Sequence, residues 1–191
     1  ARYYTFFGSL TQDWYLYDIT TGAHRNLTAD LGVTFWNEDT DTPGLPRPYS
    51  ASTWVENEEY FLIGDRYDLW QFDPKGEKAP FMITEGLGKT TDNNFKVARP
   101  IHDPKAKRTR FGNAAGPLKV GEPLYFSSFN RVTREHGFYM KDITKKKAKM
   151  VKLAEGPYSM SIGGISLSNE YPGIAQVGKS QKPPRKLSIP V

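Results

Sequence analysis

The sequence predicts an all-β fold made of short antiparallel strands, and three observations support this prediction. Aromatic residues make up 14% of the 191 residues and gather in short runs, as is typical of β-strands. The hydrophobic pattern contains no amphipathic helix of ordinary length. One short signature occurs three times, and a repeated strand–turn–strand unit is typical of modular β architectures.

The signature consists of an aromatic strand, an Asp, a tight polar turn and a hydrophobic exit strand. Its copies run over residues 14–28, 69–84 and 137–154, and their aspartates are Asp18, Asp73 and Asp142. The copies lie further apart than the roughly 40–50 residues of compact propeller repeats. We attribute the extra length to loop insertions at 29–50 and 105–121.

The first unit is predicted to contain strands at 2–7, 14–17 and 24–27. Asp18 and Gly22 supply the residue types that a hairpin turn requires. Residues 29–50 are expected to form a long loop, because they contain several Pro and Gly residues without a clear period. Loops of this length are usually functional or mobile.

The stretch 51–84 gives the clearest prediction. Short strands are expected at 53–55, 60–63, 69–72 and 81–84. The turn Asp73-Pro74-Lys75-Gly76 is a strong one, since Pro presets its own φ and Gly accepts a positive φ. Four short antiparallel strands within about 35 residues correspond in size and layout to one propeller blade.

A third unit begins at 97–101 and continues, after the basic insertion, with strands at 124–129, 137–141 and 150–153. A fourth begins at 158. The sequence thus predicts a partial β-propeller of three to four blades over residues 1–170, with units at about 1–28, 49–86, 97–156 and 158–170. Residues 171–191, rich in Pro, are expected to form an irregular or extended tail.

A propeller ring must close, and three or four blades leave two open ends. We therefore expect this chain to be part of a longer polypeptide or to pair with another one.

Two stretches carry a family resemblance. Residues 49–76, and above all Gly64–Gly76, resemble the propeller domain of the prolyl oligopeptidase family, which includes dipeptidyl peptidases and acylaminoacyl peptidases. The next blade of that group is similar to Leu124–Asn130 followed by Gly137-Phe138-Tyr139. The resemblance also includes the loop with Asp41-Thr42-Pro43 and Pro46. The resemblance covers roughly residues 14–165. The third unit departs from it by placing lysines where a turn glycine is usual.

The resemblance implies a non-catalytic propeller that gates access of short peptides to a separate α/β-hydrolase domain. That domain would carry the Ser, Asp and His of a serine peptidase and is absent from this sequence, so no activity is expected from this segment alone. The implied partners are the remainder of the polypeptide and short peptides, and the implied location is periplasmic or secreted, with the cytoplasm left open. No cofactor is implied.

Two other interpretations stay open. Propellers of the TolB type share the same turn pattern, so the chain could be a stand-alone propeller that serves as a protein-binding scaffold. A glycan-binding or glycan-cleaving propeller is a third interpretation, although no paired carboxylates point to it.

Asp65, Arg66 and Asp68 form a charged turn inside the most telling motif and are the candidate substrate-binding residues. In a structural role, their side chains would bond backbone donors or one another across the hairpin. In a functional role, they would contact the terminus of a peptide substrate. We favour the structural role.

The sequence gives no catalytic residue and no metal site. Ser159-Met160-Ser161-Ile162-Gly163 lacks the first glycine of a nucleophile elbow and has no helix pattern after it. His24, His102 and His136 match no metal-binding spacing. The acidic cluster Glu38, Asp39 and Asp41 lacks the Gly and the terminal Glu of an EF-hand loop, so a mobile acidic loop is expected.

Composition argues against two classes of partner. The net charge is +5, and the basic runs at 105–110, 145–149 and 179–186 fall in predicted loops, where lysine is normally solvated. We therefore expect no nucleic-acid partner. No apolar run approaches the roughly 20 residues needed to span a bilayer. There is no cysteine, and hence no disulfide, cysteine-based metal site or thiol nucleophile.

Overall fold

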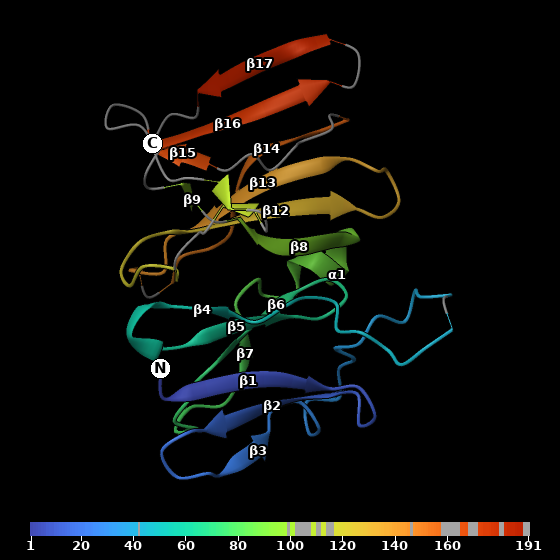
Figure 1. The fold of residues 1–191 in the computed structure, drawn as a ribbon. Coiled ribbons are helices and arrows are strands. Elements are labelled where there is room, and N and C mark those ends of the chain that lie inside the picture. The colour runs from blue at the N-terminus through green and yellow to red at the C-terminus, as the bar shows by residue number, and fades with distance from the viewer. Residues whose placement is uncertain are drawn as a thin grey trace. The chain divides into compact units, whose positions relative to one another are not determined.

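The chain folds into two compact units, residues 1–94 and 95–191 (Figure 1). The computed structural model describes residues 1–41, 43–98, 117–145 and 147–157, and for the strand residues 100–101, 108–109, 112–113, 165–167, 172–179 and 182–188 it describes the backbone alone. Strands dominate the described residues, and the single α-helix among them is short, α1 (Leu87–Thr91). The mostly β prediction is confirmed.

The first unit begins with a three-stranded antiparallel sheet in the order β1-β2-β3. Its strands are β1 (Tyr3–Gly8), β2 (Asp13–Asp18) and β3 (His24–Asn26), close to the predicted positions. The turn after β2 forms as its residue types predict, because Asp18 Oδ1 accepts a hydrogen bond of 2.9 Å from the N–H of Thr20, and Gly22 adopts a φ of 72°.

The second sheet of this unit contains the four predicted strands in chain order. They are β4 (Thr53–Trp54), β5 (Phe61–Gly64), β6 (Leu69–Phe72) and β7 (Phe81–Met82). The short 3₁₀ turn η1 (Glu56–Glu58) joins β4 to β5. In the turn after β6, the Asp73 carboxylate accepts hydrogen bonds from the backbone of Lys75, Glu77 and Lys78, and Gly76 has a φ of 76°.

An aromatic core joins the two sheets of the first unit face to face. It contains buried residues from both sheets and from the segment before β4: Trp14, Leu16, Phe35, Phe61, Ile63, Trp70 and Phe72. The rings of Phe61 and Phe72 are stacked with centroids 5.4 Å apart, and Phe35 contacts Trp70 edge-on at 6.0 Å. Phe35 is 1% exposed, so the loop predicted at 29–50 contributes a residue to the core.

Both sheets of the first unit contain the same hydrogen-bond motif, which we call the Asp–Thr clasp. In the second sheet, Thr84 Oγ1 donates to Asp68 (2.6 Å) and accepts from the N–H of Leu69 (3.1 Å). In the first sheet, Thr28 Oγ1 donates to Asp13 (2.8 Å) and accepts from the N–H of Trp14 (3.0 Å). The clasp ties the exit of the last strand to the start of the strand before it, so the sequence repeat is also a structural repeat.

A third antiparallel sheet has the order β14-β13-β12-β8. Its strands are β8 (Asn93–Ala98), β12 (Leu124–Asn130), β13 (His136–Lys141) and β14 (Val151–Gly156). Aligned on the turn aspartates, Gly137 takes the place of the clasp Asp in this sheet, and the strand register pairs it with Glu155, where the other two sheets have the clasp Thr. Both partners of the clasp are replaced together in this third copy.

The remaining strands belong to the second unit. The insertion predicted at 105–121 contains the paired strands β10 (Arg108–Thr109) and β11 (Gly112–Asn113). A fourth sheet has the order β17-β16-β15-β9, built from β9 (Pro100–Ile101), β15 (Ile165–Leu167), β16 (Pro172–Lys179) and β17 (Lys182–Ser188). In it, β9 and β15 are parallel, unlike the strands of the predicted meander.

The tail at 171–191 was expected to be irregular or extended, and most of it is paired as β16 and β17. Proline does not prevent this pairing, because β17 is an edge strand and an edge strand tolerates a missing N–H on its outer side. Within the fourth predicted unit, residues 158–164 and 168–170 lie outside the described residues.

Candidate functional site

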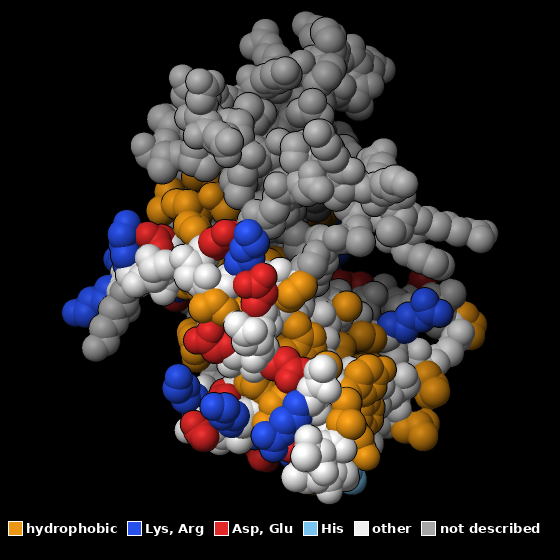
Figure 2. All heavy atoms as spheres, turned by 60° about the vertical axis from the view of Figure 1, so that its left-hand side comes forward, with side chains coloured by type: hydrophobic (Ala, Val, Ile, Leu, Met, Phe, Trp, Pro, Cys, Tyr) orange, Lys and Arg blue, Asp and Glu red, His pale blue; other side chains and the backbone are white. Residues whose placement is uncertain are grey.

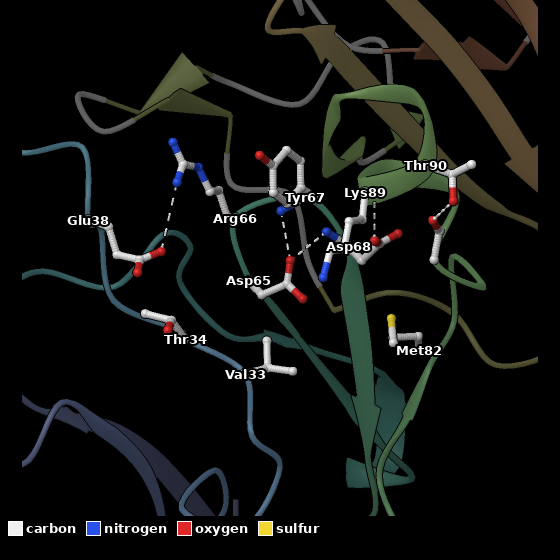
Figure 3. Close-up of a pocket in the computed structure, with 11 residues that line it drawn as sticks. Val33, Thr34, Glu38, Asp65, Arg66, Tyr67, Asp68, Met82, Lys89 and Thr90 are labelled. Atoms are coloured by element: carbon white, nitrogen blue, oxygen red, sulfur yellow. Dashed lines mark hydrogen bonds and ion pairs between the residues drawn. The ribbon is translucent and has the colours of Figure 1, made fainter.

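The hairpin turn between β5 and β6 borders a pocket of about 620 Å³ in the first unit (Figure 3). The residues that line it come from this turn, from the segment before β4, and from β7 and α1: Val33, Thr34, Glu38, Asp65, Arg66, Tyr67, Asp68, Met82, Gly86, Lys89 and Thr90. The structure thus brings all three candidate substrate-binding residues to one pocket.

The Asp65 carboxylate organises the hairpin turn. Its Oδ1 accepts the N–H groups of Tyr67 (2.7 Å) and Asp68 (2.6 Å), and its Oδ2 accepts the indole N–H of Trp70 (2.8 Å). Asp65 is buried. Burial raises the pKa of the Asp65 carboxyl, whereas the hydrogen bonds that it accepts act in the opposite direction. The side chain fixes the turn and positions Trp70 for the core.

Asp68 joins the hairpin to the start of α1. In addition to its bond with Thr84, its carboxylate accepts the N–H groups of Gly88 (2.9 Å) and Lys89 (3.0 Å). These are backbone donors in the first turn of a helix, which have no partner inside the helix itself. Gly88 permits this close packing, because a Cβ there would overlap the carbonyl group of Tyr67. Asp68 is only 1% exposed, so its carboxylate serves the fold.

Arg66 is the candidate whose side chain forms ion pairs with the long loop. Its Nη2 lies 2.6 Å from Asp39 Oδ1, and its Nη1 lies 4.0 Å from Glu38 Oε2. Its side chain stays 31% exposed. The guanidinium also lies over the Tyr67 ring at 5.7 Å. Two of the three members of the predicted acidic cluster therefore pair with Arg66, and Asp41 is exposed.

Hydrogen bonds within the long loop position its acidic residues. Trp36 and Pro48 form an antiparallel bridge, and the N–H of Asn37 donates to the carbonyl of Arg47 at 2.7 Å. Next to this bridge, the N–H of Glu38 donates to the Tyr49 hydroxyl at 3.0 Å. The loop is thus a small hairpin that presents Glu38 to the pocket. Thr42, part of the loop motif that carries the family resemblance, lies outside the described residues.

Sequence reasoning did not predict the rest of the lining. Val33 and Met82 give the pocket an apolar part, while Lys89 adds a second cation from α1. Lys89 is exposed and forms no ion pair with any residue that the structure describes. No sequence signal marked it, because a helix of five residues is too short to produce a hydrophobic period.

The other candidates do not join this pocket. His24 lies on β3 opposite Tyr17, and the ring of His136 on β13 contacts Phe129 at 5.0 Å. His102, Ser159 and Ser161 lie outside the described residues. Within the described part of the chain, no three His, Asp or Glu side chains gather as metal ligands would. In the same part, no helix has the length and apolar character to cross a membrane.

The side chains that line the pocket differ in how far the fold already uses their polar atoms. The described lining contains neither Ser nor His, and the Asp65 and Asp68 carboxylates accept hydrogen bonds from the fold itself. What it presents is charge of both signs, from Glu38, Arg66 and Lys89, beside an apolar part. On the molecular face in Figure 2, acidic and basic side chains are likewise interspersed, with hydrophobic ones between them.

Comparison with known proteins gives no family and no relative. No model of a known protein family matches the chain. A search of curated proteins and a search of solved structures also find no match.

Proposed function

We propose that this chain is a β-propeller segment of a serine peptidase resembling the prolyl oligopeptidase family, where it gates the access of short peptides to a catalytic α/β-hydrolase domain. That domain lies elsewhere in the polypeptide. The chemistry is peptide-bond hydrolysis by Ser, His and Asp outside these residues, and the location is periplasmic or secreted. The resemblance of residues 49–76 to that family is the starting point.

The observation that carries the proposal is the structural repeat. Two sheets of the first unit contain the same Asp–Thr clasp and stack face to face through aromatic residues. Propeller blades are four-stranded antiparallel sheets stacked in this way. The β4–β7 sheet has the strand order of a blade, and so does the sheet formed by β8 and β12–β14.

The pocket supports the peptide part of the proposal. A short peptide carries an ammonium group at one end and a carboxylate at the other, joined by side chains that are often apolar. Glu38 suits the ammonium group, Arg66 or Lys89 suits the carboxylate, and Val33 and Met82 suit an apolar side chain. The pocket is a place where such a peptide could be held on its way to the catalytic domain.

A fluorophosphonate probe for serine hydrolases tests the proposal. We expect it to label the natural polypeptide that contains this sequence, and we expect that polypeptide to hydrolyse short peptides. The isolated 191-residue chain should remain unlabelled. Absence of label on the natural polypeptide would refute the peptidase and favour the stand-alone TolB-like scaffold, whereas label on the isolated chain would refute the non-catalytic role.

A further inference from the structure

The outer face of the first sheet carries four aromatic side chains, which we call the aromatic face: Tyr4 and Phe6 on β1, and Tyr15 and Tyr17 on β2. The rings of Tyr4 and Phe6 are stacked at 6.3 Å, and those of Phe6 and Tyr15 at 5.3 Å. Tyr4 is 60% exposed, and Phe6 and Tyr17 are each 37% exposed. Aromatic side chains bury about 150–250 Å² each when covered, so this face is a large apolar patch for a protein surface.

The strand register shows which residues of the second sheet correspond to the aromatic face. In the first sheet, Tyr4 lies opposite Tyr17 and Phe6 lies opposite Tyr15. In the second sheet, Phe61 lies opposite Phe72 and Ile63 lies opposite Trp70. Aligning the two sheets on their turn aspartates, Asp18 and Asp73, makes these two sets of four residues equivalent.

The equivalent face of the second sheet is covered. Phe61, Ile63, Trp70 and Phe72 are buried against Trp14 and Leu16, which point from the opposite face of the first sheet. The contact is therefore head-to-tail. The inner face of the first sheet packs on the face of the second sheet that is equivalent to the aromatic face. The aromatic face carries the same kind of side chains as the covered face of the second sheet, but no described residue covers it.

We propose that the aromatic face docks a further antiparallel β-meander, which presents apolar side chains at the positions equivalent to Trp14 and Leu16. This meander is part of the same natural polypeptide, outside these 191 residues. The proposal rests on the propeller part of the proposed function but not on the peptidase part. The Trp14 and Leu16 of a second copy of this chain are already buried in its own core, so they do not supply this contact.

Photo-crosslinking tests the docking. The photoreactive p-benzoylphenylalanine replaces Tyr15 in the natural polypeptide, and mass spectrometry maps the crosslinked peptide. We expect the crosslink to reach a strand of the same polypeptide outside these 191 residues, at a position with alternating apolar side chains. A crosslink to a separate protein, a crosslink to another part of these residues, or no crosslink would overturn the proposal.

The control places the same photoreactive residue at Leu10, which is 85% exposed in the turn between β1 and β2. This position should not give the strand crosslink. A second measurement guards against misfolding: Tyr4→Lys should lower the melting temperature of the natural polypeptide and leave that of the 191-residue chain nearly unchanged. An equal change in melting temperature in the natural polypeptide and in the 191-residue chain would contradict a covered aromatic face. The readouts need no enzymatic activity, so a failed hydrolase label leaves this test intact.

Discussion

The Thr84 hydroxyl donates a 2.6 Å hydrogen bond to the Asp68 carboxylate, and both side chains are buried. The same hydroxyl accepts the N–H of Leu69, so one threonine satisfies a buried carboxylate and a buried backbone donor. Since Thr28 and Asp13 repeat the arrangement in the first sheet, the clasp is the element by which the two sheets are recognised as copies.

Replacing Thr84 by Val keeps the shape of the side chain and removes its hydroxyl. The N–H of Leu69 then loses its partner in a buried site, and Asp68 loses one of its donors. We expect the free energy of unfolding to fall by about 1 to 3 kcal/mol, as measured by urea denaturation.

Thr28→Val is the matched substitution in the first sheet. Its effect should be smaller, because Asp13 is less buried than Asp68 and can bind water in place of the hydroxyl. A Thr84→Val variant as stable as the wild type would show that the clasp does not hold the sheet.

Asp65→Asn tests the role of Asp65 in the hairpin. An Asn that keeps its oxygen toward the N–H groups of Tyr67 and Asp68 must turn its amide N–H₂ toward the indole N–H of Trp70, so two donors face each other. We expect a loss of about 1 to 3 kcal/mol in unfolding free energy and a change in tryptophan fluorescence.

Trp70→Phe removes the indole donor, so Asp65→Asn should lower the unfolding free energy less in a protein that already carries Trp70→Phe. A double-mutant cycle measures this coupling. Equal costs of Asp65→Asn in both backgrounds would contradict a direct bond between Asp65 and Trp70.

Arg2 and Asp18 predict how stability depends on pH. Hydrogen bonds from the Arg2 guanidinium lower the pKa of the Asp18 carboxyl from 3.8 to about 2. A carboxyl whose pKa is lower in the folded state adds stability above the unfolded pKa and loses it as pH falls through the folded pKa. The wild type should therefore lose more stability between pH 3.8 and about 2 than Asp18→Asn does.

Urea denaturation across this pH window measures the difference, with the exposed Asp30→Asn as control. The Asp30→Asn variant should follow the wild type. If Asp18→Asn also follows it at every pH, the ion pair contributes nothing to stability.

Arg66→Met tests the pocket in the natural polypeptide. If Arg66 holds the carboxylate of a short peptide, the variant should raise KM by about 10-fold or more with kcat little changed, since binding is lost without loss of chemistry. Lys75→Met is the control, because it removes the same charge from an exposed turn that does not line the pocket. A similar KM for Arg66→Met and Lys75→Met would show that Arg66 does not bind the peptide.

Local sequence signals predicted most of the strands near the turns. The Asp-to-Gly turns after β2 and β6 formed where the residue types require them, because Asp bonds the backbone and Gly accepts a positive φ within a few residues. The all-β class followed from the aromatic runs for the same local reason.

The parts that the sequence did not predict depend on distant contacts. Phe35 enters the core from a segment rich in turn residues, and Arg66 pairs with Asp39 from another loop. Neither partner is marked by spacing along the chain. The pairing of β16 with β17 was not predicted, because the prolines indicated an irregular or extended tail, while an edge strand can accommodate proline.

The central claim is that the sheets are successive blades of one larger propeller, and a crystal structure of the natural polypeptide tests it most directly. We predict that the β1–β3 sheet and the β4–β7 sheet follow one another around a common axis, with a further meander on Tyr4 and Tyr15. A structure in which these sheets form a closed sandwich, with the aromatic face exposed to solvent, would contradict the claim.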